Sequence, residues 1–152
     1  MRIAFDEGLP CGPFTIRVED GLVTDVARGV SEDARPATRL ESEAFWRHFE
    51  GRGRFCYAFD FRRFTPFQAD VMRALSSVRP GERVTYGELA ILAGHPMAHR
   101  AVGSVMAGNP YSIFFGCHRV VPRSGGVGSY GPGGAGLKAA LLEWEARRYG
   151  DI

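Results

Sequence analysis

The spacing of apolar residues changes near residues 62–65, and this change limits the folds that the chain can adopt. Before it, the stretches 15–19 and 22–26 alternate apolar and polar residues around an Asp-Gly pair, a strong signal of a β-hairpin. After it, apolar residues recur every three or four positions, as on one face of a helix. We therefore predict an α/β (α+β) fold, with a β-rich N-terminal domain at 1–62 and a mainly helical C-terminal domain at 63–152.

Local signals predict further elements in the N-terminal part. The polar stretch 31–39 is expected to form a loop, and 44–49 a helix that ends near Gly51. Aromatic residues alternate over 55–61, which predicts a strand.

Capping signals mark the first helix of the C-terminal part. Thr65, Pro66 and Gln68 are typical of a helix start, and Pro80-Gly81 ends this helix. A last amphipathic helix is predicted from three apolar residues near the C-terminus: Leu137, Leu141 and Trp144.

Two short helices with a turn at 94–96 lie between these two. Their pattern fits a DNA-binding helix-turn-helix and an ordinary αα-hairpin equally well. One face of the second helix is apolar, with Ala98, Ala101, Val102 and Val105. The opposite face carries one arginine and three small residues: Arg100, Gly103, Ser104 and Ala107. Small residues allow close approach to another surface, so this face favours contact with a nucleic-acid groove.

Composition excludes several classes of protein. The formal net charge is only +2, and its basic excess falls in the second half of the chain, a weak bias toward a polyanion. The three cysteines include no CxxC pair, which argues against a zinc ribbon or a disulfide scaffold and for a reducing compartment. Whether Cys11 and Cys56 form a disulfide is left open by the sequence. The sequence has no long apolar run, so no membrane helix is expected, and the N-terminus does not resemble a signal peptide. We expect a cytoplasmic protein without a metal.

Cys117 and His118 stand side by side within an apolar run. A thiolate is a strong nucleophile, and a histidine held by an acid can generate it. Glu145 on the last helix is a candidate for that acid, with a water bridging the Cys-His pair. The alternative is a buried cysteine that serves packing alone. The glycine-rich loop that follows contains GxGxxG but no room for a βαβ unit, so no dinucleotide cofactor is expected.

In combination, these motifs resemble the O(6)-alkylguanine-DNA alkyltransferase (methylated-DNA–protein-cysteine methyltransferase) family. The matching segments are Thr85-Tyr86-Gly-Glu-Leu-Ala90, Arg100-Ala-Val-Gly103, Gly108-Asn109-Pro110, Cys117-His-Arg-Val-Val121, Gly128-Ser-Tyr130 and Leu141-Leu-Glu-Trp-Glu145. They cover residues 64–148 densely. The N-terminal part fits only in length and hairpin character, and the resemblance implies a ribonuclease-H-like domain there.

The resemblance implies DNA repair by direct reversal. Cys117 would accept the alkyl group of O(6)-alkylguanine irreversibly, in a single turnover, and whether O(4)-alkylthymine is also accepted stays open. His118, polarised by Glu145, would take the thiol proton through water. Asn109 would brace the turn, and Tyr86 would rotate the nucleotide's phosphate and donate a proton to the base.

The resemblance also implies the DNA contacts. The partner would be double-stranded DNA with alkylated bases, bound by a monomer through the minor groove with the target base flipped out. Arg100 would fill the gap in the stack, beside Gly103, Ser104, Ala107 and Tyr86. The substrate pocket would be formed by five residues: Met106, Val120, Ser129, Tyr130 and Gly116. Arg119 is expected to pair within its own domain.

Two residues depart from the family's pattern. Gly116 and Ser112 stand where the family usually has prolines, which predicts a looser turn. Proline at 116 is expected to stabilise the protein by about 0.4–1 kcal/mol if the native φ suits it. Two other functions compete: a non-catalytic lesion-binding relative, which commonly has tryptophan in place of the cysteine, and a thiol-based sensor, for which no resolving cysteine is evident.

Overall fold

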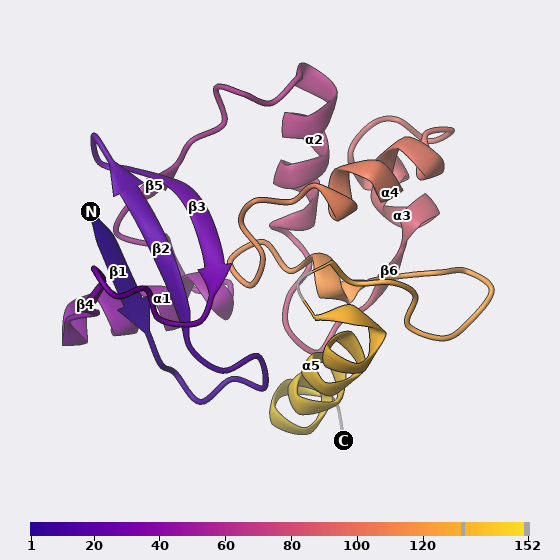
Figure 1. Cartoon of the computed structure of the whole chain (residues 1–152). Helices are drawn as coiled ribbons and strands as arrows, with labels where there is room; N and C mark the ends of the chain where they lie inside the picture. Colours follow the sequence, from indigo (N-terminus) through magenta and orange to yellow (C-terminus); the bar gives the residue numbers. More distant parts are fainter. Residues whose placement is uncertain (132, 151–152) are drawn as a thin grey trace.

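The computed structural model describes residues 1–131 and 133–150, and it places a sheet beside a helical half (Figure 1). Asp20 and Gly21 both have positive φ, 51° and 77°, as a two-residue hairpin turn requires. They join β2 (Phe14–Glu19) to β3 (Leu22–Arg28) in an antiparallel pair. The predicted hairpin is confirmed.

The sheet has the strand order β4-β1-β2-β3-β5. β1 (Arg2–Phe5) runs antiparallel to β2, while the two short strands β4 (Arg35–Pro36) and β5 (Ala58–Phe59) pair in parallel with β1 and β3. One face of this sheet is covered by α1 (Arg39–Phe49).

Two predictions for this half are wrong in extent. The helix begins at Arg39 and not at 44, because Thr38 and Glu41 form a capping box at its start, and β4 lies inside the expected loop. Over 55–61 only Ala58–Phe59 pairs as a strand. Two of the aromatic side chains that suggested a longer strand, Phe55 and Phe59, pack instead against the ring of Phe114.

The helical half begins as predicted. Thr65 and Gln68 form a capping box at the start of α2 (Pro66–Leu75). Then come β6 (Val84–Thr85), α3 (Tyr86–Leu92) and α4 (His99–Ala107). A 3-10 turn, η1 (Cys117–Arg119), leads into β7 (Val120–Val121), which pairs in parallel with β6. The chain closes with α5 (Gly134–Tyr149).

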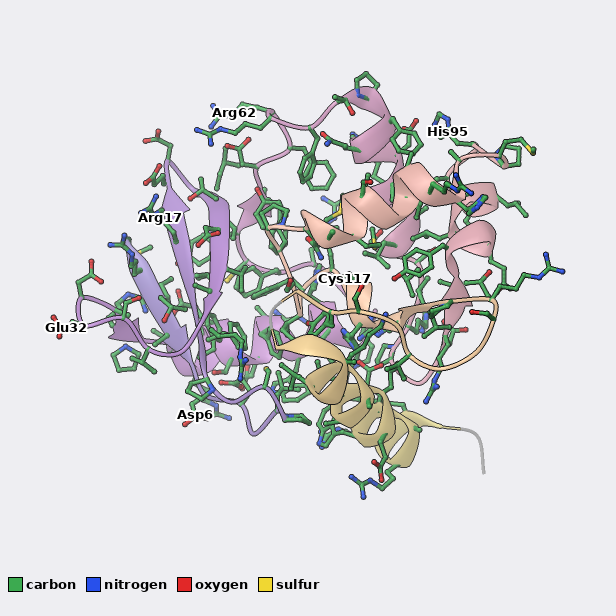
Figure 2. The ribbon with its side chains drawn as sticks, turned by 45° about the vertical axis from the view of Figure 1, so that its right-hand side comes forward. Asp6, Arg17, Glu32, Arg62, His95 and Cys117 are labelled. Atoms are coloured by element: carbon green, nitrogen blue, oxygen red, sulfur yellow. The ribbon has the colours of Figure 1, made fainter. Side chains whose placement is uncertain are left out.

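The two predicted short helices are confirmed, and residues of α2 contact the turn between them. α3 and α4 contact each other and both contact α2. His95, labelled in Figure 2, lies in the turn, where its Nε2 is 3.0 Å from Oδ2 of Asp70 and its ring meets that of Phe67. The arrangement is that of a helix-turn-helix supported by a third helix. None of the helices in the described residues has the length and apolarity needed to cross a membrane.

A shared aromatic core joins the two halves. The ring of Phe114, which precedes the catalytic candidate Cys117, lies 4.8–6.3 Å from five rings of the N-terminal half: Phe5, Phe14, Phe45, Phe55 and Phe59. Hydrophobic residues of both halves form one buried cluster. The division at 62/63 therefore stays a prediction about sequence organisation, since the packing runs across it.

We predict that Phe114→Ala destabilises the whole chain in one cooperative step. Removing a buried phenylalanine costs about 3–5 kcal/mol, and both halves lose contacts with this ring. Phe64→Ala is the control, because Phe64 is partly buried and, within the part of the chain that the structure describes, its ring meets only the rings of Phe61 and Tyr111. Its cost should therefore be smaller. Urea unfolding followed by tryptophan fluorescence and by circular dichroism measures both variants. Two separate transitions, of which only one shifts, would contradict the shared core.

Candidate active site and DNA-facing surface

The turn that carries Cys117 is braced by Asn109. Its Nδ2 donates to the carbonyl of Phe115 at 3.0 Å, and its Oδ1 accepts from the backbone N–H of Tyr111 at 2.9 Å. Within the turn, Ile113 has φ 77°, a strained conformation for a β-branched residue. The loop between α4 and Cys117 is thus fixed by the Asn109 side chain together with backbone bonds, such as that from the Phe115 N–H to the Tyr111 carbonyl at 2.9 Å.

Cys117 and His118 lie in the 3-10 turn η1, so their side chains point in different directions. Successive residues of such a turn point about 120° apart. Cys117 faces a cavity beside α4, while His118 points to α5 and is fully buried. Figure 2 shows Cys117 at the centre of the molecule, between α4 and α5.

Glu145 ties this turn to α5. Its carboxylate has no exposed surface and accepts from Nε2 of His118 at 2.6 Å. It also accepts from Nε and Nη2 of Arg119, at 3.0 and 2.9 Å. The remaining donor of Arg119, Nη1, reaches the carbonyl of Val78 at 3.0 Å. Arg119 therefore pairs within its own half, as expected, and its guanidinium also lies over the ring of Phe49.

The protonation states follow from this network. Burial alone would raise the pKa of Glu145, but hydrogen bonds from His118 and Arg119 outweigh it and hold that pKa at about 2. The ionised carboxylate only accepts, so Nε2 of His118 carries the hydrogen. Burial lowers the pKa of His118, which keeps the ring neutral and leaves the lone pair on Nδ1. Nδ1 is buried and has no hydrogen-bond partner among the described residues. It is available as a base.

Burial raises the pKa of the Cys117 thiol, while the side chains of Asn109 and Ser112 and the charge of Lys138 oppose this shift. Oγ of Ser112 lies 4.0 Å from Sγ. Burial likewise raises the pKa of Tyr86, so its hydroxyl keeps its proton near neutral pH. The resting site thus holds a protonated thiol and a phenol that can donate.

Lys138 is a site residue that sequence reasoning missed. It is fully buried, and its Nζ donates to the carbonyls of Val120 at 2.6 Å and Ser129 at 3.3 Å. The same Nζ lies 5.8 Å from the centre of the Tyr86 ring. A signal did exist, because Lys138 precedes Glu145 by two helical turns and so shares its face. It is also the only lysine in the chain.

A pocket of about 200 Å³ opens beside the thiol. Seven of the fourteen predicted site residues meet there, since its lining consists of Tyr86, Gly103, Met106, Ala107, Cys117, Ser129 and Tyr130, together with Gly131. Two predicted pocket residues, Val120 and Gly116, are not part of it. Val120 is fully buried in β7, and Gly116 lines a different cavity. The pocket therefore joins the catalytic turn to the helix-turn-helix.

The exposed face of α4 carries the predicted DNA-facing residues. Arg100, Ser104 and Ala107 are exposed, and a Cβ at Gly103 would lie 4.0 Å from the Tyr86 ring. The buried face differs from the expected one: Val102 and Met106 are its buried residues, whereas Ala101 is exposed. Met106 is buried because it reaches the pocket beside Cys117.

Gly116 serves a different purpose from the one predicted. Its φ of −71° and ψ of 65° form an inverse γ-turn, closed by a 2.7 Å bond from the Cys117 N–H to the Phe115 carbonyl. This φ suits proline, but a Cβ at 116 would lie 2.6 Å from Nη1 of Arg119. Proline or alanine must therefore displace the guanidinium that holds Glu145. The expected stabilisation by proline is not supported, because the glycine provides space and not flexibility.

Neither a disulfide nor a metal site is found among the cysteine and acidic side chains of the described residues. Cys11, Cys56 and Cys117 are all free thiols, so the Cys11–Cys56 disulfide is not formed. Over residues 1–131 and 133–150 no three His, Cys, Asp or Glu side chains gather as they would around a metal ion.

Comparison with known proteins identifies relatives of this site. The family model for the DNA-binding domain of 6-O-methylguanine DNA methyltransferase matches residues 66–147. A human methylated-DNA–protein-cysteine methyltransferase is 50% identical over 78 residues, which are 51% of this chain and 37% of that protein. The protein of the same name from Mycobacterium bovis is 46% identical over 86 residues, 57% of this chain and 52% of that protein. The matched segments thus span about a third to a half of these relatives.

Solved structures match over almost the whole chain. Mycobacterium tuberculosis OGT in complex with DNA has a TM-score of 0.73 at 32% identity, covering 96% of this chain and 94% of that one. The O6-methylguanine-DNA methyltransferase of Pyrococcus kodakaraensis has a TM-score of 0.70 at 28% identity, covering 95% and 99%. The likeness extends to the N-terminal sheet, which the family model does not reach. The chain belongs to the 6-O-methylguanine DNA methyltransferase family.

Proposed function

We propose that this protein repairs DNA by transferring the alkyl group of O(6)-alkylguanine to Cys117, once and irreversibly. The observation that carries the proposal is the orientation of His118. Its Nε2 is held by the ionised carboxylate of Glu145, and its Nδ1 is buried without a hydrogen-bond partner among the described residues. His118 directly follows Cys117 in the sequence. A neutral imidazole in that state can take the thiol proton through a water.

The reaction balances with the groups present. The thiol proton goes to Nδ1 of His118, and the sulfur electron pair forms the new S–C bond. The C–O bond breaks, and its electron pair leaves on the base. The Tyr86 hydroxyl, which lines the pocket and keeps its proton, supplies a proton to the departing guanine. The thioether that forms cannot return to a thiol by these steps, so the protein acts once.

We propose that the substrate is alkylated double-stranded DNA and that α4 enters its minor groove. The alkylated oxygen cannot be reached inside the stack, so the nucleotide must be flipped into the pocket. The small residues on the exposed face of α4 suit close approach, and Arg100 extends from the same face. We further propose that a monomer acts in the cytoplasm with access to the nucleoid, or in the nucleus if the source is a eukaryote.

Intact mass spectrometry tests the central claim. After mixing with DNA that contains O(6)-methylguanine, each molecule should gain one CH₂ unit, located on Cys117 by peptide mapping. Cys117→Ser should still bind the DNA and gain nothing, because its hydroxyl is a far weaker nucleophile. Methylation at the buried Cys11 or the exposed Cys56, or repeated turnover, would overturn the assignment.

The pH dependence should report the neutral state of His118. Burial lowers its pKa below the ordinary value of about 6.5, so the base form persists at pH 6.5 and is lost only at lower pH. The second-order rate constant should therefore stay level down to pH 6.5 and fall below it. Glu145→Gln should reduce the rate throughout, since an amide does not fix the tautomer. Stopped-flow measurements with a fluorescent substrate test this, and an acid limb centred above pH 6.5 contradicts it.

Arg100→Ala should slow repair of duplex DNA by tenfold or more, since filling the vacated stack offsets an unstacking cost of a few kcal/mol. Reaction with the free base O(6)-benzylguanine should change little, because no stack is opened. Arg147→Ala on α5 is the matched control, as that arginine is also exposed but lies on another element. Equal rates for Arg100→Ala and the unchanged protein on duplex DNA would exclude the proposed role.

A further inference from the structure

A second cavity lies between the two halves of the molecule. Its volume is about 580 Å³, and its walls come from the end of α1, the segment around β5, the end of α2 and the turn before Cys117. These elements are labelled in Figure 1. It shares no lining residue with the active-site pocket: Gly116 lines this cavity, and Cys117 lines the other. The volume lies within the range of small-molecule sites, about 300–1,000 Å³.

Aromatic rings form much of its wall. They come from both halves, and they include Phe55, Tyr57, Phe59, Phe61 and Phe115. Phe55 and Phe115 are buried, whereas the other three keep part of their surface accessible. A wall of this kind suits a flat aromatic ring, which gains by stacking against such faces.

The charge of the lining is one-sided. Arg54, Arg73, Arg79 and Arg119 line the cavity together with His48, and no aspartate or glutamate of residues 1–131 and 133–150 does. Arg119 is committed to Glu145. Arg73 has one distant partner on its own helix, Asp70 at 3.7 Å, and lies over the Phe61 ring.

Arg54 and Arg79 have no side-chain ion pair or hydrogen bond within 1–131 and 133–150. Three guanidinium groups therefore face this cavity with little or no compensation. A guanidinium group can donate two parallel hydrogen bonds to the oxygens of one phosphate. Because no carboxylate among the described residues lines this cavity, these donors are available to an anion.

We propose that this cavity binds a nucleoside monophosphate, with the base among the aromatic rings and the phosphate at the arginines. A neutral aromatic compound would leave the arginines unused, and inorganic phosphate would leave the rings unused. The cavity is distinct from the pocket at the thiol, because the two share no lining residue.

Calorimetric titration of the unmodified full-length chain with GMP and AMP tests the proposal without DNA. Saturable binding is expected at one site, with guanosine and inorganic phosphate each at least tenfold weaker. Arg73→Gln and Arg79→Gln should each weaken GMP binding by about fivefold or more. Phe61→Leu should weaken GMP but leave the weak phosphate binding unchanged. Arg17→Gln, at an exposed sheet position labelled in Figure 2, is the control and should bind GMP normally.

Several results would overturn the proposal. These are no saturable GMP binding, equal affinity for phosphate and GMP, or equal losses in Arg17→Gln and the cavity variants. Displacement of GMP by an unalkylated duplex would assign the arginines to DNA phosphates instead. Thermal melting of each variant shows whether it is folded, and GMP should raise the melting temperature only where it binds. None of these outcomes depends on methyl transfer, so they are distinguishable from failure of the proposed repair activity.

Discussion

The carboxylate of Glu145 lies in the interior, and three features depend on it: the pairing of Arg119, the orientation of His118 and the attachment of α5 to η1. A buried charge is costly unless a partner compensates it, and here Arg119 supplies the opposite charge through two hydrogen bonds. The same carboxylate orients His118, so one group from α5 both joins the helix to η1 and sets the tautomer of the base. Removing either Arg119 or Glu145 leaves the other charge buried without its ion-pair partner, which costs about 3–5 kcal/mol. Stability and chemistry therefore rest on the same contact.

This contact also explains the shape of the turn before Cys117. The guanidinium of Arg119 fills the space where a Cβ of residue 116 would stand, so glycine at that position and the ion pair fit together. Asn109 fixes the other end of the turn by bonding the Phe115 carbonyl. Between them, Phe114 anchors the turn in the aromatic core of the N-terminal half. The thiol is positioned by contacts from the whole chain, although the sheet contributes no residue to the pocket.

The helix-turn-helix and the reactive turn meet in one small pocket. Gly103 and Ala107 lie on the face of α4 that we propose enters DNA, and both also line the cavity that holds Cys117. Their small size leaves room beside Tyr86, and it also suits the close approach of a groove that we propose. A base leaving the stack at α4 would have only a short distance to travel to the sulfur.

Local signals in the sequence were sufficient for the hairpin and for the capped start of α2, whereas the helix-turn-helix and the Cys-His-Glu set were identified through several motifs that together resemble one family. Each depends on neighbouring residues, such as the positive φ available to Asp-Gly or the capping pair Thr65 and Gln68, or on motifs that occur together. The full length of α1, the short β5, the burial of Lys138 and the space at Gly116 were not evident. The start of α1 follows from a local capping box, Thr38 with Glu41, that was not recognised from the sequence. The other three depend on which distant side chain occupies a given volume: Phe114 among the aromatic rings of residues 55–59, Glu145 and Arg119 behind the turn. Spacing along a chain specifies which residues can share a face, but only the packed interior specifies what that face meets.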